Sequence, residues 1–184
     1  MAASPLPSLP GRRISVVGTT GSGKTTLAAA LARRLGIPHF EMDALYWGPN
    51  WSGTPPEILR PRVAAALAGE AWVIDGNYSI VRDIILSRAD TLVWLDYAFP
   101  VIFWQLFLRT LRRALRREEL WAGNRERLGT AFFSRDSILW WAIQTYRRRR
   151  RQYSALLADP AYAHLIFVRL RTRAATRAWL DALP

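Results

Sequence analysis

The segment Gly18–Thr25 constrains the fold of this chain more than any other. Its sequence, Gly-Thr-Thr-Gly-Ser-Gly-Lys-Thr, follows the apolar run Ile14–Val17 and precedes the Ala- and Leu-rich run Thr26–Leu35. The first run has the length of a buried strand, and the second has the length and composition of a helix. A GxxxxGK[ST] pattern between a strand and a helix is typical of a loop that binds nucleotide phosphates.

The charge of a triphosphate explains each part of this pattern. Glycines let the backbone curl close to the phosphates and present several N–H groups at once. The positive end of the following helix points at the same anion. Lys24 is expected to reach the β- and γ-phosphates, and the Thr25 hydroxyl to bind Mg²⁺. The residues predicted to bind the nucleotide here are Gly18, Gly21, Ser22, Gly23, Lys24, Thr25 and Thr26.

Lysine usage supports a specific role for Lys24. The chain has 26 basic residues, and Lys24 is the only lysine among them. A compact ammonium group suits a point contact with phosphate better than a planar guanidinium does. The alternative is a plain glycine turn with a solvated lysine, which accounts for neither the full motif nor its flanking elements.

Length and composition limit the class of protein. The 184 residues, 51% of them hydrophobic, fit one domain with a buried core. The absence of cysteine excludes disulfides and thiolate metal sites, and it is compatible with a reducing compartment such as the cytoplasm. Residues 1–11 do not resemble a signal peptide, so we expect a disordered lead-in followed by a single domain over residues 12–184. The net charge of +12 predicts an anionic partner: nucleotide, nucleic acid or a membrane surface.

Segments typical of strands and helices alternate along the chain. Further strands are predicted at His39–Asp43, Ala71–Gly76, Thr91–Asp96 and Leu165–Leu170, and helices at Glu57–Ala68, Ser79–Arg88, Val101–Arg117, Ser134–Leu157 and Thr172–Leu183. This order predicts an α/β fold with a parallel sheet and helices on both faces. The apolar run Leu92–Leu108 contains Asp96 and Pro100, which favour strand, turn and helix over a transmembrane span.

Acidic residues stand at the carboxyl ends of several predicted strands. Asp43, Asp75 and Asp96 each occupy such a position, and ligands of α/β sheets bind at this edge. Asp75 and Asp96 both follow an apolar run, so the pattern alone leaves open which of them positions Mg²⁺. His39 and His164 are isolated, and we assign them no role.

Four segments together resemble the adenylate-kinase-related P-loop kinases, and within them the branch labelled DNA topology modulation protein. They are Gly18–Thr25, Met42–Trp47, Val73–Tyr78 and Leu95–Tyr97. The resemblance covers residues 13–117 well, the terminal strand and helix loosely, and residues 118–160 little. It implies a three-layer P-loop NTPase fold with strand order 2-3-1-4-5 and a lid-like region at residues 109–151. It also implies phosphoryl transfer from ATP with Mg²⁺ to a nucleotide or another small molecule.

The resemblance further implies roles for residues at the strand ends. In these kinases the third strand ends in an Asp-Gly pair beside the phosphate loop. This favours Asp75 over Asp96 as the acidic residue that positions Mg²⁺. Asp43 would face the acceptor, as a base for a hydroxyl or as a positioning group for a phosphate; capping a turn is its structural alternative. The predicted substrate-binding residues are Asp43, Trp47, Gly76, Asn77 and Tyr78.

Arginines are placed where the resemblance implies phosphate and adenine contacts. A face of the helix predicted at Val101–Arg117 carries Arg109, Arg112, Arg113, Arg116 and Arg117. At the lid entrance such residues clamp transferring phosphates, so Arg109 and Arg113 are predicted to be catalytic together with Lys24; a solvated basic face is the alternative. Arg171 and Arg173 fall in the loop expected to wrap around adenine. The five arginines of Arg147–Arg151 cannot all face one site.

Three functions remain compatible with these patterns. The first is an ATP-dependent kinase, and the second is a nucleotide-binding regulatory protein that binds nucleic acid without kinase turnover. The third is an adaptor held at a membrane through Phe99–Phe107. A GTPase is disfavoured because the chain lacks Asn-Lys-x-Asp and Asp75 lacks the Asp-x-x-Gly continuation. Two aromatic sets, Tyr46, Trp47, Trp51 and Tyr78, and Phe99, Phe103, Trp104 and Phe107, could contact a ligand or a partner, or could simply pack together. The identity of the acceptor and the oligomeric state are left open.

Overall fold

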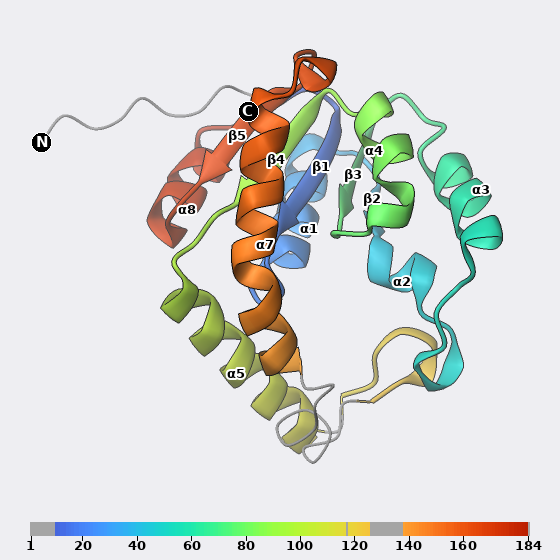
Figure 1. Ribbon diagram of the computed structural model, residues 1–184, viewed down its shortest axis with the longest axis vertical. Helices are drawn as coiled ribbons and strands as arrows, with labels where there is room; N and C mark the ends of the chain where they lie inside the picture. The colour runs from blue at the N-terminus through green and yellow to red at the C-terminus, as the bar shows by residue number, and fades with distance from the viewer. Residues whose placement is uncertain (1–9, 117, 126–137, 184) are drawn as a thin grey trace, which may run out of the picture.

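The computed structural model describes residues 10–116, 118–125 and 138–183 (Figure 1). Its centre is a five-stranded sheet in the order β2-β3-β1-β4-β5, and every pair is parallel. The strands are β1 (Arg13–Gly18), β2 (His39–Glu41), β3 (Trp72–Asp75), β4 (Thr91–Leu95) and β5 (Ile166–Leu170). The predicted α/β class and the implied order 2-3-1-4-5 are both confirmed.

Helices cover both faces of the sheet and make three layers (Figure 1). One face packs against α1 (Lys24–Leu35) and α8 (Arg173–Asp181). The other packs against α3 (Pro56–Ala66), α4 (Arg82–Arg88) and α7 (Ile138–Ala158). α2 (Met42–Tyr46) follows β2, and α5 (Phe99–Arg116) runs from the end of β4 away from the sheet. Short 3₁₀ turns lie at Pro49–Trp51, Ser79–Val81, Trp121–Gly123 and Pro160–Tyr162.

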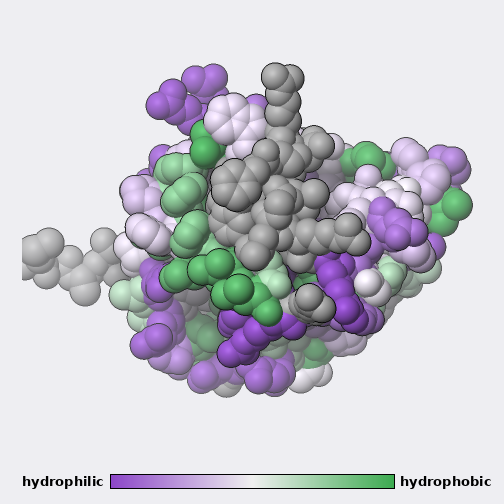
Figure 2. Space-filling model, turned by 90° about the horizontal axis from the view of Figure 1, so that it is seen from below, coloured by the Kyte–Doolittle hydropathy of each residue, from purple (hydrophilic) through white to green (hydrophobic). Residues whose placement is uncertain are grey.

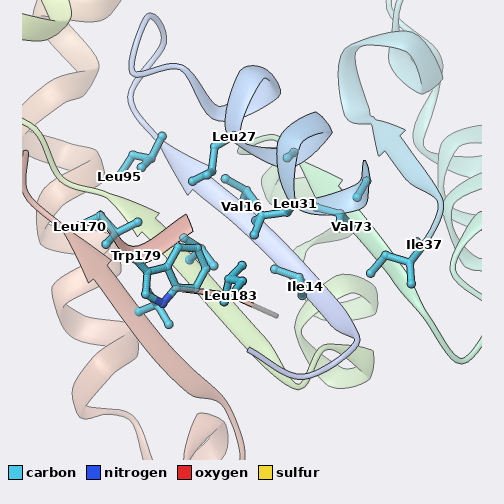
Figure 3. Close-up of a cluster of buried hydrophobic side chains, with 14 of the residues drawn as sticks. Ile14, Val16, Leu27, Leu31, Ile37, Val73, Leu95, Leu170, Trp179 and Leu183 are labelled. Atoms are coloured by element: carbon cyan, nitrogen blue, oxygen red, sulfur yellow. The ribbon is translucent and has the colours of Figure 1, made fainter. Parts of the chain in front are cut away.

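Alternation along the central strand distributes side chains to both cores. Ile14 and Val16 point to one face, where they meet Leu27 and Leu31 of α1 (Figure 3). Trp179 of α8 fills the same layer and is 1% exposed. Because both faces are covered, the inner strands are apolar throughout rather than alternating with polar residues.

The structure departs from our prediction after the second strand. β2 ends at Glu41, and Met42 begins a helix, so Asp43 lies in a helical turn rather than at a strand end. Met42 is fully buried, and its Cβ lies where a side chain on Gly76 would be. This packing across two strands is tertiary, and the local sequence did not reveal it.

Some predicted segments extend beyond the described residues. Residues 1–9 of the predicted lead-in and residues 134–137 of the predicted helix Ser134–Leu157 lie outside them. Gly11 also falls within the predicted lead-in, yet its N–H donates to Thr91 Oγ1 at 2.8 Å. Of the predicted lid-like region, the structure describes the end of α5, residues 118–125 and the first two-thirds of α7.

α5 has an exposed apolar side. Trp104 and Leu108 are each 59% exposed, whereas Phe99 packs on Phe103 and Tyr146. Seen from below, apolar and hydrophilic side chains lie side by side on this part of the surface (Figure 2). Within the described ranges, none of the helices combines the length and the apolar character needed to cross a membrane.

An ion cluster around the buried carboxylate of Asp96 joins β4, β5 and α7. Asp96, directly after β4, accepts from Arg169 Nη2 at 2.6 Å, and its Oδ1 lies 2.7 Å from Arg150 Nε. The Arg169 guanidinium also lies over the Trp94 ring, 4.4 Å from its centre. The charge of Asp96 therefore holds α7 against the sheet edge.

We expect Asp96→Ala to lower the free energy of unfolding by about 3 kcal/mol, because it leaves two guanidinium groups without their carboxylate. Chemical denaturation measures this loss. The matched control is Asp83→Ala, whose pair with Arg60 has side chains 63% and 42% exposed and should contribute less than about 1 kcal/mol. Equal losses in the two variants would contradict a structural role for the Asp96 cluster.

Candidate active site

The loop between β1 and α1 is shaped for an anion. Gly21 has φ +85°, and a Cβ there would lie 2.7 Å from the Leu106 Cβ of α5, so the loop tip requires glycine. Within the described chain, no side chain caps the N-terminus of α1 at Gly23. Ser22 Oγ is buried and has no hydrogen-bond partner among the described residues. These unused groups suit a phosphate, which accepts hydrogen bonds from such donors.

The ammonium group of Lys24, at the end of this loop, has a lowered pKa. Its Nζ donates to the Thr19 carbonyl at 3.3 Å. Burial lowers the pKa of Lys24 to about 8, and the nearby carboxylates of Asp75 and Asp43 oppose this shift. The positive charges of Arg109 and Arg149 lower the pKa further. Charges of both signs, two carboxylates and two guanidinium groups, therefore act on the Lys24 ammonium.

Thr25 and Asp75 provide oxygen ligands beside the loop. The Thr25 hydroxyl donates to Asp75 Oδ2 at 2.7 Å, and Asp75 is 5% exposed. Hydroxyl and carboxylate oxygens are ligands that Mg²⁺ prefers, and Mg²⁺ usually takes only one or two of them from the protein, with phosphates and water completing its shell. No cluster of three or more His, Cys, Asp or Glu side chains suited to a metal occurs in the described residues. The donor set thus fits Mg²⁺ shared with a nucleotide, and Asp96 is instead engaged with two arginines.

His39 is a site residue that sequence reasoning missed. Its Nε2 lies 3.0 Å from Asp75 Oδ1, so Asp75 is held between His39 and Thr25. The contact arises because β2 pairs with β3 in a register that aligns His39 with Val73. No local pattern identifies this histidine, since the register between distant strands is a tertiary property.

Asp43 and Tyr78 face each other on the acceptor side. The Tyr78 hydroxyl donates to Asp43 Oδ1 at 2.5 Å. Burial, the charge of Asp43 and this hydrogen bond together raise the pKa of Tyr78, so the phenol remains a donor at neutral pH. The Asp43 carboxylate is thereby oriented by Tyr78 rather than used to cap a turn.

Asn77 fixes the loop from the neighbouring strand. Its Oδ1 accepts from the Gly18 N–H at 3.2 Å, and its Nδ2 donates to the Gly18 carbonyl at 2.5 Å. The Tyr153 hydroxyl of α7 also donates to Asn77 Oδ1, at 2.6 Å. These contacts give the Asn77 side chain a positioning role, and its predicted contact with substrate stays a prediction.

The predicted aromatic wall is packed against itself. Tyr46 lies 4.8 Å, centre to centre, from both Trp47 and Tyr78, and Trp47 lies 5.5 Å from Trp51. These edge-on and tilted contacts are typical of a small hydrophobic cluster. Trp47 is half-buried, so its predicted contact with substrate remains a prediction.

Residues 118–125 dock onto the loop that follows α2, which the sequence did not indicate. Asn124 is 5% exposed; it accepts from the Trp51 N–H at 2.8 Å and donates to the Gly48 carbonyl at 2.9 Å. Trp121 Nε1 donates to Glu41 at 3.0 Å, close to the end of β2. Part of the lid-like region therefore borders the acceptor side.

The predicted arginines lie in different environments. The charge of Arg109 acts on Lys24, whereas Arg113, one turn later on α5, lies 3.7 Å from Glu118. Arg171 and Arg173 are exposed beside a surface hollow of about 440 Å³. With its amide oriented to satisfy both neighbours, Gln105 accepts from Arg173 at 2.8 Å and donates to the Gly21 carbonyl at 3.1 Å. The hollow is thus connected to the tip of the phosphate loop.

The sheet order and the phosphate loop together define the P-loop kinase class of fold. The model of the family described as "ATPase family associated with various cellular activities (AAA)" matches residues 14–81. "Uncharacterized protein YqaC" of Bacillus subtilis (strain 168) is 29% identical over 86 residues, which cover 46% of this chain and 48% of that protein. The match therefore spans about half the length of this curated relative.

Solved structures of kinases share the fold over nearly the whole chain. Shikimate kinase from Bacteroides thetaiotaomicron gives a TM-score of 0.52 at 19% identity, covering 92% of this chain and 94% of that one. A gluconokinase from Sinorhizobium meliloti 1021 gives 0.51 at 18%, covering 94% and 92%. Shikimate kinase from Acinetobacter baumannii in complex with shikimate gives 0.54 at 17%, covering 92% and 89%. At these identities the likeness establishes the fold alone.

Binding of ATP should take up protons near pH 8. The pKa of Lys24 is lowered to about 8 in the free protein, and a bound triphosphate favours the charged ammonium and raises that pKa. Calorimetric titration in two buffers of different ionisation enthalpy measures the uptake. It should vanish below about pH 6, where Lys24 is already charged, and in Lys24→Arg, which does not titrate in this range. Uptake of equal size in Lys24→Arg would assign it to another group.

Proposed function

We propose that this protein is a Mg²⁺-dependent kinase that transfers the γ-phosphoryl group of ATP to a nucleotide or another small molecule. The observation that carries the proposal is the meeting of three groups at the carboxyl edge of the sheet. The carboxylate charges of Asp75 and Asp43 both act on the Lys24 ammonium. Asp75 is hydrogen-bonded to Thr25, and Asp43 is hydrogen-bonded to Tyr78. This reaction requires a loop that binds phosphate, an acidic residue that binds Mg²⁺ and a carboxylate beside the acceptor.

Each group has a role in the transfer. The acceptor oxygen forms a bond to the γ-phosphorus as the bond to the bridging oxygen breaks, and ADP leaves. Lys24 and Arg109 stabilise the negative charge on the transferring group. Asp43 takes the proton of a hydroxyl acceptor or positions a phosphate acceptor, which needs no base. Thr25 and Asp75 would hold Mg²⁺, which neutralises phosphate charge when bound.

The adenylate-kinase-related assignment belongs to this proposal, as does the DNA topology modulation protein branch. Support comes from two of the four segments that carry the resemblance, Met42–Trp47 and Val73–Tyr78, which contact each other. Tyr78 touches Asp43 and Tyr46, and Met42 packs over Gly76. The likeness of the fold to kinases of small molecules also supports a small acceptor.

The hollow beside Arg171 and Arg173 is the proposed adenine site. Ala98, Val101 and Trp104 line its apolar part, and Arg171, in the loop after β5, and Arg173, the first residue of α8, line it as well. Apolar side chains together with a guanidinium suit an aromatic base, because the guanidinium can stack on the ring. The bond from Gln105 to Gly21 then links base and phosphate subsites.

Exposed arginines favour a second candidate function, nucleic-acid binding without kinase turnover. Arg112 and Arg116 on α5 and Arg148 and Arg151 on α7 are exposed, and the chain carries a net charge of +12. Such binding should weaken steeply with salt, because phosphate contacts release counterions. It would not require Lys24.

The deciding measurement is ADP release from Mg·ATP across nucleoside monophosphates, nucleosides and small hydroxyl compounds. We expect one acceptor class to stimulate turnover, and Lys24→Ala to lower the stimulated rate by about 10²-fold or more, because it removes charge stabilisation of the transferring group. Asp75→Asn should raise the Mg²⁺ concentration needed for half-maximal rate. The matched control is Asp83→Asn, which changes an exposed carboxylate that pairs with Arg60.

If no acceptor stimulates ADP release, and the wild type and Lys24→Ala behave alike, the proposed kinase function is contradicted. Nucleic-acid binding that survives Lys24→Ala and falls with salt would then favour the second function.

A further inference from the structure

α5 is apolar on two of its sides, and only one of them is buried. The buried side lies against the tip of the phosphate loop at Gly21 and consists of Ile102, Leu106 and Thr110. The exposed side carries large apolar residues spaced three, four and seven positions apart, so they form one stripe along the helix. The stripe consists of Val101, Trp104, Leu108 and Leu115, of which the last two are 59% and 67% exposed.

α7 extends this apolar surface. It packs against α5, and the centres of the Phe99 and Tyr146 rings lie 5.2 Å apart. In Figure 1 the start of α7 lies beside α5 in the lower part of the view. This part of α7 adds three exposed side chains, Trp140, Trp141 and Ile143. We call these three residues and the stripe on α5 the α5–α7 surface.

Exposed apolar side chains are concentrated on this surface. Outside α5 and α7, the large apolar side chains exposed in the described chain are Trp51, Ile58 and Ile80, which belong to three different elements. Isolated apolar residues are normal on a protein surface, whereas a group of them marks a site of interaction. The α5–α7 surface is therefore expected to contact a partner.

Charge indicates the kind of partner. Neither α5 nor α7 contains an aspartate or a glutamate. Exposed arginines accompany the apolar residues on both helices, and the Arg148 guanidinium lies 6.0 Å from the centre of the Trp141 ring. A second copy of the chain would bring arginines against arginines, which is unfavourable. The exposed arginines are Arg112 and Arg116 on α5, and Arg147, Arg148 and Arg151 on α7.

An anionic membrane surface matches both properties. Tryptophan is enriched at the level of the lipid headgroups. A helix with Trp and Leu on one side and arginine beside them lies in this interface, with its apolar side at the boundary of the acyl chains. Anionic headgroups attract the arginines, and the net charge of +12 adds to this attraction. A nucleic acid matches the arginines only, because it offers no apolar layer to Leu108 and Leu115.

We propose that the α5–α7 surface binds membranes that contain anionic lipids. α5 lies in the plane of the interface, where Leu108 and Leu115 contact acyl chains and Arg112 and Arg116 contact lipid phosphates. Binding requires neither ATP nor turnover, so the inference goes beyond the proposed kinase function and does not depend on it. Val101 and Trp104 also line the hollow proposed for adenine, so the variants that test the surface are chosen elsewhere.

Flotation of the full chain with vesicles tests this surface. One set of vesicles is phosphatidylcholine alone, and the other contains phosphatidylcholine and phosphatidylglycerol in equal parts. We expect binding to the anionic vesicles and little to the neutral ones. Leu108→Asn and Leu115→Asn should each weaken binding about tenfold, because each removes an apolar side chain from the acyl boundary. Arg112→Gln and Arg116→Gln should each weaken it about fivefold, through the loss of one charge.

The matched controls lie on other helices. Ile58→Asn changes an exposed isoleucine of α3, and Arg33→Gln changes an exposed arginine in the last turn of α1. Both should bind the anionic vesicles as the wild type does. An unchanged midpoint of chemical denaturation verifies that each variant is folded.

Fluorescence quenching provides a second measurement. Lipids brominated in their acyl chains quench tryptophans that enter the membrane. We expect quenching with anionic vesicles and less of it in Trp140→Phe and Trp141→Phe. The tryptophans buried in the core, Trp72, Trp94 and Trp179, are not accessible to the lipid.

Three outcomes would overturn the proposal. The first is the absence of binding to anionic vesicles, or a loss of binding that is as large in Ile58→Asn as in Leu108→Asn. The second is binding that depends on the arginines but not on Leu108 and Leu115, which would show attraction to any polyanion without an apolar contact. The third is a dimer in analytical ultracentrifugation that Leu108→Asn dissociates, without vesicle binding, which would assign the surface to a second copy of the chain.

Discussion

The hydrogen bonds between Asn77 and Gly18 fix the point at which β1 becomes the phosphate loop. Asn77 follows β3, and the Tyr153 hydroxyl of α7 holds it in turn. One amide side chain thus joins two strands and a helix at the sheet edge. Because a loop that binds phosphate through its backbone must be preorganised, the position of Lys24 and of Thr25 depends on this clamp.

Acidic residues are scarce in this chain, and their placement decides what each arginine does. The sequence has 14 acidic against 26 basic residues. Asp96 is used for structure because two arginines share it, whereas Asp75 remains beside Thr25 and the phosphate loop. The two carboxylates therefore differ in their surroundings, although both follow a buried strand.

The α/β class was predictable from the sequence, because the phosphate-loop motif and the alternation of apolar and helical segments are local properties. The strand order came from the resemblance to a known family, and its sequence segments lie in contact in the structure. Asp75 and Asp96 follow equivalent apolar runs, so the sequence pattern could not separate them. Their surroundings differ because α7 and β5 bring arginines to Asp96, whereas α1 and β2 bring Thr25 and His39 to Asp75.

The sequence by itself determined the parallel sheet, the phosphate loop and the identity of Lys24 as its single lysine, because these depend on residues close in the chain. Only the tertiary structure decided that His39 contacts Asp75, that Tyr78 orients Asp43, and that Tyr153 holds Asn77. Each of these contacts joins elements far apart in sequence. Their distances are set by strand register and helix packing, which no local pattern records.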